Sequence, residues 1–177
     1  MSRKAIIQQP STETRGSGGS VREAWTARTT AYVEIEPLRG NELFNAQEKY
    51  GKVTARAKLY HHFGISPDMR ILFPREVGAL SSAVEDTAYT DIEVATGVTF
   101  PPRGDFLIKI EDELLNVTQT SGSASTAWTV ERAQDGTAAS THDAETLVQR
   151  MVVYDIISPI ENLYEDLSMT ILVSERM

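Results

Sequence analysis

The apolar residues at both ends of the chain recur at every second position. In segment 53–60 the odd-numbered residues are apolar and the even-numbered ones are polar or aromatic, and segment 167–173 has apolar residues at the same odd positions. A period of two is typical of a half-buried antiparallel strand. Segments rich in β-branched or aromatic residues predict further strands at Ala5–Gln8, Val21–Thr26, Ala31–Glu36, Met69–Phe73 and Met151–Ile156. Together they predict a mainly β fold whose core is a small antiparallel β-barrel or sandwich.

One segment breaks the β pattern and predicts a short helix. Leu43, Phe44 and Gln47 lie at helical spacing within segment 41–50. Asn41 is the expected capping residue, and Gly51 is expected to stop the helix. The connection that contains this helix is longer than a hairpin requires, and such loops usually make functional contacts.

The middle third of the chain has its own β pattern. Its turn residues separate strands expected at Asp91–Ala95, Asp105–Ile110, Glu113–Thr118, Thr126–Arg132 and Thr146–Gln149, and Glu76–Thr87 before them is a weakly apolar linker. Trp128 supplies this part with a large apolar anchor. The sequence therefore predicts a discontinuous β core from residues 1–75 and 151–177, interrupted by an inserted β-rich domain at 76–150.

Charge is distributed in agreement with this division. The 177 residues carry a net charge of -8, and residues 76–150 alone contain 4 basic and 13 acidic side chains. Residues 1–75 contain 12 basic and 7 acidic side chains, and residues 151–177 contain 1 and 5. The predicted insert is therefore acidic, whereas the two ends together are nearly neutral.

Composition removes several classes of function. The chain has no cysteine, which excludes disulfides, thiolate metal sites and a cysteine nucleophile. No apolar run approaches the roughly 20 residues of a membrane span, and the N-terminus has no signal-peptide core. We therefore expect neither secretion nor a membrane partner.

Outside the middle third, several short sequence motifs follow one another in a fixed order. Trp25 lies in a strand ahead of Ala31–Gln47, Val53–Arg56, Gly64–Arg70, Val153–Ile156 and the closing strand Leu167–Val173. Blocks of this character in this order resemble the head-tail joining, or head closure (stopper), proteins of long-tailed bacteriophages. The order of the blocks is more specific than any one of them.

The resemblance implies a structural virion protein at the phage neck, assembled in the host cytoplasm. Such a protein would form a ring of about six copies below the portal and its adaptor, a symmetry that the sequence cannot show. It would retain the packaged genome and offer a docking surface to a tail terminator or tail-completion protein. Double-stranded DNA would pass through the ring without sequence recognition, and no cofactor would be needed.

The resemblance also assigns a role to the long connection. The long connection would line or narrow the channel and pack on neighbouring copies, through Leu38, Arg39, Gly40, Asn41, Glu42, Leu43, Phe44 and Gln47. Separately, the alternation places Arg56 and Lys58 on one polar strand face, which is more often a solvated or intersubunit surface than a DNA site. Family members usually pass almost directly from the Met69–Phe73 strand to the Met151–Ile156 strand, so the acidic middle third is an insertion. Its segment 130–148 is similar to a small β module of phage structural proteins.

Catalysis and metal binding have weaker support. The sequence contains no nucleophile elbow or triad-like motif. Adjacent His61 and His62 would point to opposite faces of a strand, and His142 is expected to support a turn by hydrogen bonding. The carboxylates at 111–113 lack the spacing of a calcium loop, so a solvated turn is the better interpretation. We therefore expect no enzyme. The alternatives left open are a tail-tube or tail-completion protein and, less well supported, a soluble enzyme.

Overall fold

Strands dominate the computed structural model, which describes residues 1–11, 14–15, 21–22, 24–60, 64–95, 100–121, 126–158, 161–163 and 168–176. The elements are β1 (Arg3–Pro10), β2 (Thr14–Arg15), β3 (Val21–Arg22), β4 (Trp25–Pro37), α1 (Gly40–Tyr50), β5 (Ala55–Tyr60), β6 (Arg70–Ala79), β7 (Asp91–Glu93), β8 (Phe106–Ile110), β9 (Glu113–Ser121), β10 (Ala127–Glu131), the 3-10 helix η1 (Gln134–Gly136), β11 (Leu147–Ile156), β12 (Glu161–Leu163) and β13 (Ser168–Glu175). The mainly β fold predicted from the sequence is confirmed. No helix in the described ranges is long and apolar enough to cross a bilayer.

The chain divides into two compact units. Unit 1 contains Met1–Phe73 and Val152–Met177, and unit 2 contains Pro74–Met151. Each unit has its own cluster of buried apolar residues. Both boundaries fall inside strands, because β6 and β11 each contribute residues to both units.

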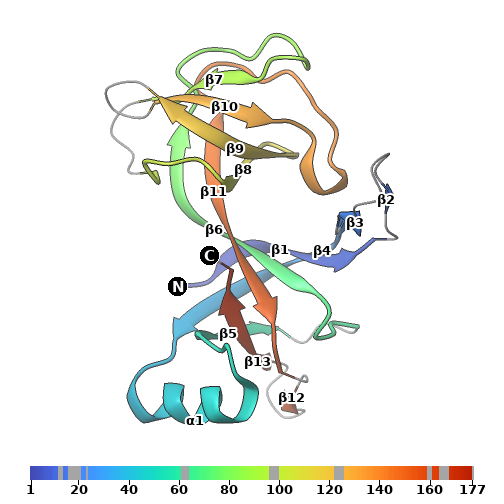
Figure 1. Ribbon diagram of the computed structural model, residues 1–177, viewed down its shortest axis with the longest axis vertical. Helices are drawn as coiled ribbons and strands as arrows, with labels where there is room; N and C mark the ends of the chain where they lie inside the picture. Colours follow the sequence, from blue (N-terminus) through green and yellow to red (C-terminus); the bar gives the residue numbers. More distant parts are fainter. Residues whose placement is uncertain are drawn as a thin grey trace. The chain divides into compact units, whose positions relative to one another are not determined.

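Unit 1 is a closed antiparallel barrel. Its strands follow the order β13-β5-β4-β1-β6-β11, and β11 pairs again with β13. The closing pairs include Tyr154 with Glu175 and Ile156 with Val173. In Figure 1 the blue N-terminal strands and the dark red strand β13 belong to this one unit. The two ends of the chain therefore build a single core.

The alternation in the sequence explains how this barrel is filled. In β5 the side chains of Ala55, Ala57 and Leu59 are buried, and in β13 those of Met169 and Ile171 are buried. The intervening residues face outward because successive side chains of a strand point to opposite faces. The small alanines leave room inside the barrel for larger side chains from other strands, which include Ile7, Ile71, Phe73 and Tyr154.

Unit 2 is a second β circuit around Trp128. Its strands follow the order β6-β11-β8-β9-β10-β7, and a bridge from Leu80 to Val94 brings the chain after β6 back beside the end of β7. Trp128 is buried, with Phe100 and Phe106 packed edge-on at centroid distances of 4.8 and 5.5 Å. The expected role of this tryptophan as an anchor is confirmed.

Three strands extend further than the alternation predicts. β4 runs without a break from Trp25 to Pro37, and β11 joins the two strands expected at 146–149 and 151–156. The linker predicted from Glu76 is wrong at its start, since β6 continues to Ala79. β6 lies next to β11 in the sheet, and Arg150 Nη1 on β11 donates to Glu76 Oε2 on β6 at 3.0 Å.

We expect unit 1 to fold without unit 2. Joining Phe73 to Met151 through a two-residue Asn-Gly turn retains the barrel strands and the apolar cluster of unit 1, and Asn-Gly suits a hairpin between neighbouring antiparallel strands. The shortened chain should unfold cooperatively in urea when followed by the fluorescence of Trp25, its remaining tryptophan. Residues 74–151 alone, followed by Trp128, are the matched control. Loss of cooperative unfolding in the shortened chain would show that the units depend on each other.

Candidate functional site

The connection between β4 and β5 is fixed to the barrel at both ends. Leu38 is buried, and its amide donates to the carbonyl of Thr54 at 3.1 Å. Val53, just before β5, is fully buried. The segment between these anchors contains α1, and both of its ends are therefore held in place.

Two glycines set the limits of α1. Gly40 takes φ +55°, in the left-handed region that glycine accepts most readily, directly after extended Arg39. Gly51 takes φ +77° and its amide donates to the carbonyl of Gln47 at 2.8 Å, so the predicted stop is confirmed. The predicted cap is wrong, because Asn41 lies inside the first turn and Arg39 at the N-cap makes no side-chain cap hydrogen bond. Glycine conformation, and not a capping side chain, allows the helix to begin.

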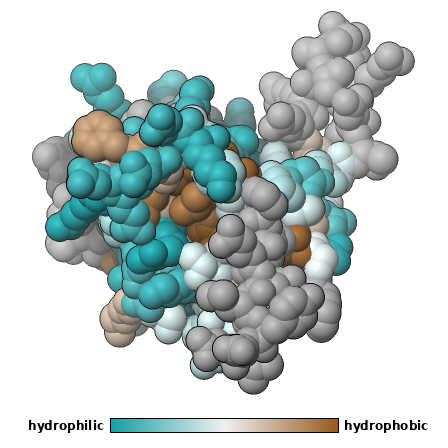
Figure 2. Space-filling model, turned by 90° about the horizontal axis from the view of Figure 1, so that it is seen from below, coloured by the Kyte–Doolittle hydropathy of each residue, from teal (hydrophilic) through white to brown (hydrophobic). Residues whose placement is uncertain are grey.

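Helix α1 buries none of its residues. Phe44 is 70% exposed and Leu43 is half-buried. Figure 2 views the molecule from the side on which α1 lies in Figure 1, and hydrophilic residues dominate the coloured surface there. An 11-residue helix with no buried face obtains little stability from its own backbone, so contacts with the barrel must hold it.

Two side-chain contacts connect α1 to the barrel. Gln47 Nε2 donates to the carbonyl of Val53 at 3.1 Å. Arg56 Nη1, on β5, donates to Glu42 Oε1 at 3.0 Å. Of the residues expected to form the functional loop, Glu42 and Gln47 thus touch the barrel, whereas Phe44 points to solvent.

The strand face that carries Arg56 and Lys58 is also paired within the chain. Glu36 lies opposite Arg56 in the register of β4 and β5, and it accepts hydrogen bonds from Arg56 Nε and Nη2 at 3.2 and 2.9 Å. Lys58 Nζ adds a third at 3.3 Å. The hydrogen bonds from Arg56 and then Lys58 lower the pKa of Glu36 below its ordinary value. Both cations remain partly exposed, and their predicted place at a subunit contact stays a prediction.

Side chains from two of the sequence motifs, the tryptophan strand and the Gly64–Arg70 segment, contact each other inside unit 1. The guanidinium of Arg70 lies 4.2 Å from the centroid of the Trp25 ring, and its Nε donates to Gln8 Oε1 at 2.7 Å. All three side chains belong to buried residues. The tryptophan strand and the arginine that ends the Gly64–Arg70 block therefore have a common structural role in the barrel.

Unit 2 contains a buried cluster of charged side chains that the sequence did not predict. Glu113 begins β9 and its side chain is fully buried. Arg132 Nε and Nη2 donate to its two oxygens, each at 2.7 Å. The amides of Ala133 and Ser140 donate to the same carboxylate, each at 3.1 Å. This carboxylate holds together three separate stretches of unit 2.

Histidine 142 completes the cluster. Its Nε2 lies 2.9 Å from Glu113 Oε2, and its Nδ1 lies 2.8 Å from Glu111 Oε2. Hydrogen bonding by His142 was expected, but its carboxylate partners were not. The solvated turn predicted for residues 111–113 is correct for exposed Glu111 and Asp112 and wrong for Glu113. His61 and His62 lie outside the described residues.

Burial alone would raise the pKa of Glu113. The hydrogen bonds from Arg132, from the amides of Ser140 and Ala133 and from His142 outweigh burial and lower this pKa to about 2. Glu113 is therefore an ionised carboxylate at neutral pH. Its partners satisfy both oxygens, which suits a structural role.

Comparison with known protein families identifies the family of this chain. The family model of phage head completion proteins matches residues 1–90, which is just over half of the chain. The chain belongs to this family. Neither the curated proteins nor the solved structures contain a match to it.

The head completion family is a family of structural phage proteins, not of enzymes, and its members act at the head together with other head and tail proteins. The matched residues include β1 to β6 and α1, and therefore the connection and the paired strand face described above. The C-terminal blocks lie beyond the match, but β11 and β13 complete the barrel that the matched strands begin.

Proposed function

We propose that this head completion protein closes the filled head. It forms a ring of about six copies below the portal and its adaptor, retains the packaged DNA and offers a surface to a tail terminator or tail-completion protein. The α1 connection lines or narrows the channel of this ring and packs on the neighbouring copy.

The observation that carries the proposal is the position of α1. The helix lies on a closed barrel, buries no residue and exposes Phe44, yet it is anchored at Leu38 and Val53 and tied down through Glu42 and Gln47. Aromatic residues are enriched at protein–protein interfaces, so exposed Phe44 on a helix that is held in position supports contact with another protein. The same connection lies within the residues matched by the family.

The charge of the protein supports a channel through which DNA passes and not a protein that recognises DNA sequence. Specific and nonspecific DNA binding both depend on cations that neutralise phosphates. The chain has a net charge of -8, and Arg56 and Lys58 already pair with Glu36. DNA that must later leave the head would meet few strong contacts on such a protein.

The test is the position of the protein in the virion. Cryo-electron microscopy of the phage particle should place a ring of copies between the portal region and the tail, with α1 toward the lumen. Density for the chain along the tail tube or at the tail end of the junction would instead support the tail-tube or tail-completion alternative. A ring at the junction with α1 on its outer surface would retain the location and refute the role of the helix.

A further inference from the structure

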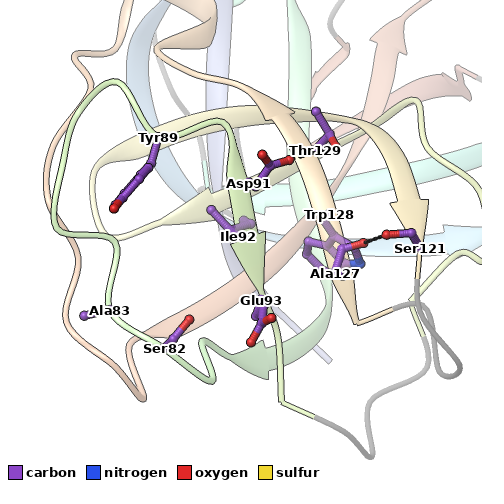
Figure 3. Close-up of a pocket in the computed structure, with 10 residues that line it drawn as sticks. All are labelled: Ser82, Ala83, Tyr89, Asp91, Ile92, Glu93, Ser121, Ala127, Trp128 and Thr129. Carbon is purple, nitrogen blue, oxygen red and sulfur yellow. Dashed lines mark hydrogen bonds between the residues drawn. The ribbon is translucent and has the colours of Figure 1, made fainter.

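Unit 2 carries a pocket to which neither the family nor the proposed function assigns a role. Its volume is about 540 Å³, within the range of ligand sites. Figure 3 shows that the outward faces of β7 and β10 form one side of it, and that Ser82, Ala83 and Tyr89 approach from the segment before β7. Buried Ile92 and Trp128 belong to its lining, so the pocket rests on the core of the unit.

The backbone of β7 changes partner at this pocket. The amide of Val94 donates to the carbonyl of Thr126, on the side of β10, whereas the carbonyl of Glu93 accepts from the amide of Ser81, on the opposite side. Main-chain groups of alternate residues point the same way in a strand, so the amide and carbonyl of Asp91 face the side of Ser81.

The chain after Ser81 does not continue along β7. It turns away through Ser82 and Ala83 and forms a bridge at Val84 with His142. The backbone of Asp91 therefore opens into the pocket, where it offers one donor and one acceptor to an extended segment.

Among the described residues that line the pocket, the two charged ones, Asp91 and Glu93, are both acidic. Asp91 and Glu93 are exposed and alternate along β7, so their carboxylates lie on the same face. Asp91 Oδ1 accepts from the hydroxyl of Thr129 at 3.0 Å, which orients it without neutralising it. Unit 2 as a whole contains 5 basic and 13 acidic side chains, so its field adds to the negative charge of the pocket.

An aromatic ring completes the lining. Tyr89 is 52% exposed, and its carbonyl accepts from Arg132 Nη1 at 3.2 Å. Arg132 is fixed by Glu113, so the buried cluster of unit 2 also positions the backbone that carries this ring. Tyr89 belongs to the same lining as the two carboxylates, and an aromatic ring and carboxylates are each suited to an ammonium or guanidinium group.

We propose that this pocket binds a lysine or arginine side chain of a basic, extended segment of a partner protein. The cation lies between Asp91 and Glu93 with the ring of Tyr89 beside it, and the main chain of the segment bonds to the backbone of Asp91. A neutral sugar could use the same hydroxyls and ring, but it would gain nothing from the charge of the pocket, so the acidic lining favours the basic segment.

The test is a titration of the full-length protein with the basic peptide acetyl-Gly-Arg-Gly-Lys-Gly-amide, in which binding is measured from the shifts of backbone amide NMR signals. The control is the acidic peptide in which glutamate replaces both the arginine and the lysine. We expect millimolar-range binding of the basic peptide alone, with shifts at Asp91, Glu93 and Tyr89. Asp91→Asn and Glu93→Gln should each weaken binding about threefold, as expected for exposed ion pairs. Raising salt from about 0.02 M to about 0.5 M should weaken it further.

Asp143→Asn is the matched control, because it removes one exposed carboxylate of unit 2 outside the pocket lining. If this variant weakened peptide binding as much as the pocket variants do, the binding would depend only on the overall negative charge of unit 2, and the proposed site would be wrong. Absence of shifts at the pocket would overturn it as well. Binding of maltose at the same residues, without binding of the basic peptide, would replace the proposed ligand by a carbohydrate.

Discussion

Replacing residues 41–50 by a short Gly/Ser bridge is expected to leave the barrel folded and to abolish the production of infectious particles. No residue of α1 is buried, so its removal takes nothing from the core of unit 1. The proposed channel element and subunit contact would be lost. In complementation of a phage that lacks the gene, the titre should fall to that of the empty-vector control, with heads that lose DNA or remain without tails.

A finer comparison uses Arg56 and Lys58. Both side chains pair with Glu36, but only Arg56 also reaches Glu42 on α1. Arg56→Gln should therefore raise amide hydrogen exchange in α1 by about two- to fivefold, the effect of losing one exposed ion pair, whereas Lys58→Gln should not. Normal titres after removal of α1 would refute the role of the helix in the proposed function, even if both substitutions behave as expected.

The second large effect concerns the buried carboxylate of unit 2. Glu113→Gln is expected to lower the free energy of unfolding of this unit by about 3–5 kcal/mol, because Arg132 would remain buried without a charged partner. Trp25→Phe leaves Trp128 as the fluorescent probe, so urea unfolding then reports on unit 2. Asp112→Asn, an exposed change in the same hairpin, should alter the free energy by less than about 0.5 kcal/mol. Equal effects of the two substitutions would contradict a structural role for Glu113.

The pH dependence of stability provides an independent measurement of the same carboxylate. The pKa of Glu113 is about 2 in the folded protein, against an ordinary value of 4.5 for the unfolded chain. As the pH falls, Glu113 therefore takes up a proton in the unfolded chain before it does so in the folded protein. Its contribution to the free energy of unfolding is complete above about pH 4.5 and is lost as the pH falls toward 2. This contribution amounts to about 3 kcal/mol. The difference in stability between the unsubstituted protein and Glu113→Gln should shrink over that interval, and a constant difference would show that Glu113 does not titrate there.

Local periodicity was sufficient to predict most of the strands. Period-two alternation identified β5 and β13, and the same alternation decides which of their side chains are buried. The change to helical spacing and the glycine at 51 identified α1 and its end. The shift in charge and the second set of turns predicted an acidic inserted domain at 76–150, which stays a prediction; the compact unit 2 spans Pro74–Met151. These features are visible in sequence because each depends on residues only a few positions apart.

Tertiary contacts decided the rest. Glu113 lies in a row of three acidic residues, and only the approach of Arg132 and His142, 19 and 29 residues further on, makes it a buried ion. The pairing of β6 with β11 extends β6 through a weakly apolar segment that no local pattern marks as a strand.

The pairing of Arg56 with Glu36 was within reach of the sequence, because alternating glutamates in one strand and alternating cations in the next are complementary. Its extension to Glu42 was not, since it depends on where α1 lies against the barrel. Sequence periodicity determines which face of a strand is buried. The partners of a charged side chain depend on strands brought together from distant parts of the chain, and only the folded barrel and the second β unit specify them.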